Sequence, residues 1–129
     1  MPFSPPPSPP PSPRGVAIAL IFAGTAQHLN AWYEHGNWLS IGQLVRAMGD
    51  WQQRRGTALA EKRRLQLAEL ADQLARRLVA SLSREAGLYA AHEMMEALDP
   101  RYDSEFARQL LQECERLLDA ADAVDGATA

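Results

Sequence analysis

The chain lacks the residues and motifs on which several common kinds of chemistry depend. Its single cysteine, Cys114, excludes an internal disulfide framework and fits a reducing compartment. The sequence contains no Gly-rich phosphate loop, no Cys-x-x-Cys pair and no Ser-His-Asp order typical of hydrolases. We therefore expect a protein that is not an enzyme and that holds no cofactor.

Long apolar runs are also missing. The most apolar stretch, residues 15–26, is shorter than the roughly 20 residues that a membrane-spanning helix needs. It follows one arginine and ends in small residues, as the apolar part of a secretory signal does. The Ser/Pro run before it carries no other positive charge, so it is a poor match for the basic start of such a signal. We therefore expect a cytoplasmic protein with no membrane partner, although this stretch does not fully exclude a signal peptide.

Proline is almost absent from the body of the chain. Eight of the nine prolines lie within residues 2–13, and the ninth is Pro100. Because proline breaks helices, the span 14–99, which is rich in Ala, Leu, Arg, Gln and Glu, favours helix. The repeated Ser-Pro-Pro-Pro of the N-terminus favours an extended segment that buries nothing. The sequence predicts an all-α, single-domain bundle of four or five helices over 15–125, with a disordered Pro-rich tail at 1–14 and a frayed C-terminus at 126–129.

Local signals place the helix ends. The first helix should cover about 16–35 and stop at Gly36, which favours a left-handed cap. Ser40 and Gln43 have the spacing of a capping box, which predicts the start of a second helix. A long third helix is expected over about 57–84. Either Ser83 caps a fourth helix or Gly87 only bends the third, and the sequence leaves both readings open.

The C-terminal third of the chain should form the remaining helices. A segment over about 84–98 would turn four side chains inward, namely Leu88, His92, Met95 and Leu98. Pro100 ends it, because the residue before a proline avoids the α region. Asp103 can cap a last helix, in which Cys114 lies on a regular apolar face and acts as a small hydrophobic residue.

Charge is distributed unevenly along the chain. Residues 46–84 hold nine basic and four acidic residues, a net charge of +5, while residues 85–129 hold three basic and eleven acidic residues, a net charge of −8. A helical wheel gathers basic residues along one flank of the long third helix. Arg63, which follows Lys62 in the sequence, is adjacent to this flank. We call the whole set the basic strip, namely Arg55, Lys62, Arg63, Arg77 and Arg84. The strip either pairs with the acidic last helix or contacts a nucleic-acid backbone.

Two further groups of residues suggest contacts or ligands. The three tryptophans, Trp32, Trp38 and Trp51, cluster around the junction of the first two helices, where they pack the core or anchor a protein partner. The segment His92-Glu93-Met94-Met95-Glu96 resembles a zinc-binding helix motif with its second histidine replaced. A catalytic zinc needs three protein ligands, and no third is apparent. We therefore expect no metal site there.

These observations favour a protein that works by binding. The leading hypothesis is a non-enzymatic helical adaptor, or a small subunit of a larger protein assembly, that binds a protein partner or self-associates. The alternative is a small subunit that binds RNA or DNA backbone through the basic strip. In fold class and charge alone, the chain is similar to the small subunits of CRISPR effector complexes, and this analogy implies only that such a role is open.

Overall fold

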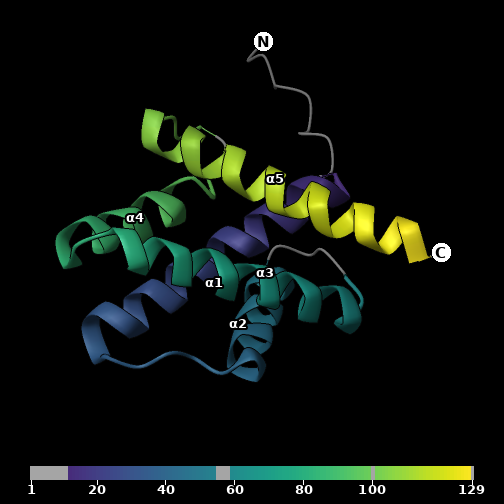
Figure 1. Cartoon of the computed structure of the whole chain (residues 1–129), viewed down its shortest axis with the longest axis horizontal. Helices are drawn as coiled ribbons and strands as arrows, with labels where there is room; N and C mark the ends of the chain where they lie inside the picture. The colour runs from purple at the N-terminus through teal and green to yellow at the C-terminus, as the bar shows by residue number, and fades with distance from the viewer. Residues whose placement is uncertain (1–11, 55–58, 100, 129) are drawn as a thin grey trace, which may run out of the picture.

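The structure, a computed structural model, describes residues 12–54, 59–99 and 101–128. Within these residues it contains five α-helices and no strand, which confirms the predicted all-α bundle (Figure 1). The helices are α1 (Pro13–His35), α2 (Ile41–Arg54), α3 (Glu61–Ser81), α4 (Arg84–Glu96) and α5 (Glu105–Thr128). The predicted disorder of residues 1–11 and the placement of Arg55 lie outside the described residues.

Helix α1 is the centre of the bundle and contacts all four other helices. In Figure 1, α5 crosses the top of the bundle and α2 lies at the bottom, with α1 and α3 between them. Leu20, Ile21 and Leu29 of α1 are completely buried. Helix α1 itself carries apolar side chains on nearly all of its sides. A helix of that composition is stable only when neighbouring helices cover it.

Side chains and one glycine fix the ends of the first two helices. The Ser12 hydroxyl accepts a hydrogen bond from the Gly15 amide at 3.0 Å, so α1 begins at Pro13, inside the segment that the sequence analysis assigned to the tail. Gly36 ends α1 with a φ of 72°, as predicted. The Ser40 amide donates to the Gln43 side chain at 2.8 Å, and the Gln43 amide donates to the Ser40 hydroxyl at 3.1 Å, which confirms the capping box.

The prediction of one long helix to residue 84 is wrong. The chain leaves helical geometry at Leu82, and the Ser83 hydroxyl accepts from the Ala86 amide at 3.3 Å to start α4. The Tyr33 hydroxyl donates to the Leu82 carbonyl at 3.1 Å, which satisfies a backbone group that the break leaves without a helical partner. Of the two readings that the sequence left open, Ser83 as a cap is confirmed.

The predicted inward face of α4 is wrong at His92 and Met95, which are exposed. The buried positions of α4 are Gly87, Ala90, Ala91, Glu93 and Met94. Small residues at three of these positions allow α4 to approach α1 closely, and packing follows them rather than the larger side chains. A Cβ atom added at Gly87 would lie 2.0 Å from the Tyr33 ring, so this glycine provides space for α1.

Candidate functional site

Two arginines of the basic strip form ion pairs with the acidic helix α5. The Arg77 guanidinium lies 3.0 Å from the Glu113 carboxylate, and the Arg63 guanidinium lies 3.2 Å from the Asp122 carboxylate. In Figure 1, α5 crosses the top of the bundle and α3 lies below it, and the two ion pairs join these helices. For these two residues the structure therefore matches the intramolecular interpretation of the charge pattern.

The basic strip does not run along one helix. Arg84 is the first residue of α4, where its guanidinium contacts the Tyr33 carbonyl at 3.2 Å and the Glu34 carboxylate at 3.6 Å. Lys62 is exposed and has no ion pair with another described residue, and Arg55 is not described. The continuous strip predicted for a long third helix is therefore wrong, because the chain breaks at residues 82–83. Contact of these residues with nucleic acid stays a prediction.

The predicted tryptophan cluster contains a stacked pair. The rings of Trp32 and Trp38 lie 4.8 Å apart at 15°, and the Arg76 guanidinium lies 4.6 Å from the centre of the Trp38 ring. Trp51 is half-buried on α2 and packs against the core. The first two tryptophans thus fix the loop between α1 and α2 onto α3.

A buried histidine and an aspartate lie beneath this stack, a pair that sequence reasoning missed. His28 is completely buried, and its Nε2 lies 2.7 Å from the Asp72 carboxylate. The Leu39 amide donates to its Nδ1 at 3.3 Å, so Nδ1 is an acceptor and Nε2 carries the proton that Asp72 accepts. Both ring nitrogens are occupied, which leaves none to take a proton from a substrate. The pair therefore acts in the fold, joining α1 to α3.

We expect the His28–Asp72 pair to make stability depend on pH. Burial lowers the pKa of His28 below 6.5, and this effect outweighs the opposing effect of Asp72. Below pH 6.5 the unfolded chain therefore binds a proton more readily than the folded chain, so stability falls with acidification. Urea denaturation at several pH values between 7 and 5 measures the free energy of unfolding. We expect it to fall with pH by at most about 1.4 kcal/mol per pH unit because of this proton.

The matched variant for this prediction is His28→Gln, which keeps an N–H donor for Asp72 but cannot titrate. In His28→Gln the free energy of unfolding should no longer fall between pH 7 and pH 5. In His35→Gln, a change at an exposed histidine of the same helix, it should fall as in the unchanged protein. An equal fall in His28→Gln and the unchanged protein would contradict the assignment.

The residues of the zinc-like motif point in different directions. His92 is exposed and lies 3.9 Å from Glu96 on the surface of α4, whereas Glu93 is only 3% exposed. In the described part of the chain, no group of three or more His, Cys, Asp or Glu side chains is placed to hold a metal ion. Burial raises the pKa of Cys114 to about 12, so its thiol is protonated at neutral pH and is a poor nucleophile.

Glu93 instead organises the loop between α4 and α5. Its carboxylate accepts hydrogen bonds from the Tyr102 hydroxyl at 2.8 Å and from the Ser104 hydroxyl at 2.6 Å. The Ser104 hydroxyl also accepts from the Ala107 amide at 3.0 Å and so caps α5. The predicted cap at Asp103 is wrong, because its carboxylate forms an ion pair with Arg108 at 3.1 Å.

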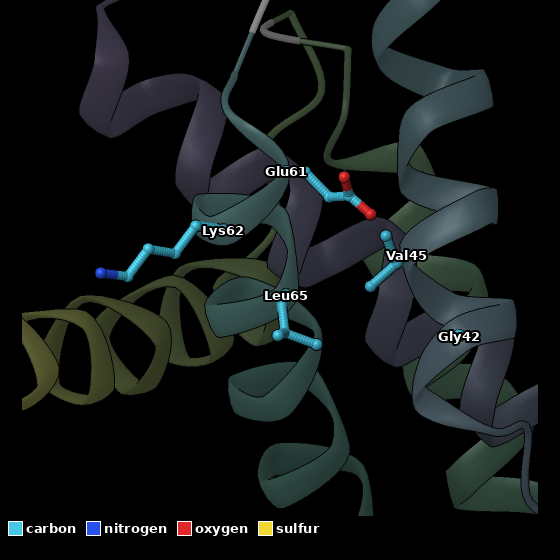
Figure 2. Close-up of a pocket in the computed structure, with 5 residues that line it drawn as sticks. All are labelled: Gly42, Val45, Glu61, Lys62 and Leu65. Carbon is cyan, nitrogen blue, oxygen red and sulfur yellow. The ribbon is translucent and has the colours of Figure 1, made fainter.

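A groove between α2 and α3 is a surface feature that the sequence analysis did not find. It has a volume of about 460 Å³ and is lined by Gly42, Val45, Glu61, Lys62 and Leu65. Figure 2 shows the Glu61 carboxylate extending toward Val45 on α2, while the Lys62 ammonium points away from α2. The available signal was Leu65, an apolar residue outside the stripe of leucines that forms the buried side of α3.

No helix in the described ranges combines the length and the apolar character that a membrane crossing requires. Comparison of the chain with family models, with curated proteins and with solved structures finds no match.

Proposed function

We propose that the chain is a non-enzymatic helical adaptor, or a small subunit of a larger assembly, that binds another protein. The observation that supports this function is the open groove between α2 and α3. Leu65 lies in this groove with 43% of its surface exposed, while Leu67 and Leu74 of the same helix are almost completely buried. One exposed leucine is ordinary on a protein surface, so the support comes from the hollow itself, which Val45 and Leu65 line from the two helices.

The alternative function, binding of a nucleic-acid backbone, has less support. A phosphate contact needs cations that are available, and Arg63, Arg77 and Arg84 already lie against carboxylates of α5 and α1. A nucleic acid that contacts these three arginines would have to compete with the carboxylates, whereas Lys62 is exposed and has no ion pair with another described residue. We further propose a cytoplasmic location, which the single buried thiol supports, because a reducing compartment suits an unpaired cysteine.

Purification of the full chain from its native host at 50 mM salt tests the function. We expect an assembly heavier than the monomer by light scattering, with one other protein, or further copies of the chain, in fixed ratio by mass spectrometry. A monomer without a protein partner would contradict the proposal. Recovery of bound RNA or DNA that higher salt releases would favour the alternative instead.

A further inference from the structure

We propose that protonation of His28 releases the loop between α1 and α2, residues 36–40, from the bundle while the helices stay folded. The inference does not depend on the proposed function, and it goes beyond the fall in overall stability described above. Three observations support it: the hydrogen bonds of both ring nitrogens, the position of Trp38 over the ring, and the way in which the loop is attached.

The hydrogen bonds of His28 suit a neutral ring and not a charged one. The Leu39 amide donates to Nδ1 at 3.3 Å, and Nε2 donates to the Asp72 carboxylate at 2.7 Å. A proton added to the ring must therefore go to Nδ1, because Nε2 already carries one. The new N–H would face the N–H of Leu39, and two donors cannot form a hydrogen bond. Protonation thus removes the bond that holds Leu39 to α1.

Trp38 covers the His28 ring. The centres of the two rings lie 4.9 Å apart at an interplanar angle of 66°, and Trp38 also contacts the Trp32 ring and the Arg76 guanidinium. Trp38 is half-buried, and His28 beneath it is completely buried. Movement of Trp38 away from the bundle would therefore admit water to the imidazole, and hydration stabilises its charged form.

The charged groups that act on the His28 ring from the described residues are Asp72 and Arg76, both on α3. Asp72 favours the protonated ring, whereas Arg76 and burial disfavour it, and burial has the largest effect on the pKa. The loop itself contains no acidic or basic side chain. Burial thus opposes proton uptake most, and release of the loop reduces that burial. Protonation and release therefore favour each other.

The other backbone hydrogen bonds of the loop belong to the helix ends on either side of it. The Gly36 amide donates to the Trp32 carbonyl at 2.9 Å and closes α1, while Ser40 forms the capping box of α2. Among the described residues, the bond from Leu39 to His28 is the one hydrogen bond from the loop to a side chain of α1. Trp38 and Leu39 can therefore move while both helix ends stay intact. Such a local opening costs less free energy than unfolding of the whole chain.

Two-dimensional amide NMR of the full chain between pH 7.5 and pH 5 tests the inference. We expect the amide resonances of Trp38 and Leu39 to shift together with a midpoint below pH 6.5, while that of Leu74 in the core stays in place. Protection of the Leu39 amide against hydrogen exchange should fall by up to about tenfold per pH unit below pH 6.5, since release is coupled to one proton. It should also be lower than the protection of the Leu74 amide, because the loop opens without the core.

Two pairs of variants assign the effect to His28. In His28→Gln, whose side chain offers a donor and an acceptor but does not titrate, the Leu39 resonance should no longer shift, whereas in His35→Gln it should shift as in the unchanged protein. Asp72→Asn removes the charge that favours the protonated ring, so the midpoint should move to lower pH. Asp50→Asn, the same change at an exposed aspartate of α2, should leave the midpoint unchanged. Circular dichroism establishes that each variant is folded.

A Leu39 amide that does not respond to pH, or that responds equally in His28→Gln, would overturn the inference. So would equal protection of the Leu39 and Leu74 amides, because the chain would then open only as a whole. If His28→Gln does not fold, Asp72→Asn decides, and a midpoint at or above that of the unchanged protein would overturn the inference. None of these measurements involves a partner, so the proposed function is tested separately.

Discussion

Replacement of Glu93 by alanine should lower the free energy of unfolding by about 3 kcal/mol, because hydrogen bonds to a buried charge each contribute about 1.5–3 kcal/mol. The carboxylate accepts from Tyr102 and Ser104, and the substitution leaves both hydroxyls without this acceptor. The loop between α4 and α5 would lose its anchor, and the start of α5 would loosen with it. Urea denaturation followed by circular dichroism measures the change.

The matched control is Glu96→Ala, which removes an exposed carboxylate from the same helix and should change stability by less than about 0.5 kcal/mol. Hydrogen bonds from Ser104 and Tyr102 hold the pKa of Glu93 below 4.5, so the folded chain binds a proton less readily than the unfolded chain. The free energy of unfolding should therefore decrease as the pH falls below 4.5. The decrease should be smaller in Glu93→Ala than in the unchanged protein. Equal effects of the two substitutions at neutral pH would show that Glu93 does not anchor the loop.

Replacement of Gly87 by alanine should lower the free energy of unfolding by about 2 kcal/mol, the cost of forcing an extra methyl into a packed contact. Three atoms of Tyr33 lie within 2.7 Å of the position that the new Cβ would occupy. The ring cannot move away without stretching its hydrogen bond to the Leu82 carbonyl. Thermal or urea denaturation measures the loss.

Gly42→Ala is the control for this prediction, since its Cβ would meet nothing closer than 3.9 Å. Gly42 lies in the first turn of α2, and alanine there restricts the unfolded chain, so Gly42→Ala should stabilise by about 0.4–1 kcal/mol and the two substitutions should have opposite signs. A neutral or stabilising Gly87→Ala would contradict the close contact between α4 and α1.

The helix ends were predictable where a short-range signal decides them. Ser40, Gln43 and Gly36 act on neighbours within four residues, so their spacing alone predicts the ends of α1 and α2. The break after Ser81 was harder to predict, because the periodic leucines continue through Leu82. The Tyr33 hydroxyl, far away in sequence, satisfies the Leu82 carbonyl and so stabilises an end that local propensity does not require.

The candidate site was less predictable because it depends on which helices meet. The sequence showed that α3 is basic and α5 acidic, but only the packing places the Arg77 guanidinium beside the Glu113 carboxylate, which offsets its charge while the side chain stays 55% exposed. In the same way, Asp72 is 44 residues from His28, and no spacing rule connects them. Leu65 could be recognised as an apolar residue off the core stripe, yet the groove exists only where α2 lies beside it.

Arg63, Arg76 and Arg77 of α3 form ion pairs within the bundle, and we propose that the groove between α2 and α3 binds a protein. The most direct test is to place a photoreactive amino acid at position 65 or at position 77 of the full chain in its native host and to identify what is cross-linked. We expect a protein adduct from position 65 and no nucleic-acid adduct from position 77. Nucleic acid cross-linked at position 77, with no protein cross-linked at position 65, would contradict it.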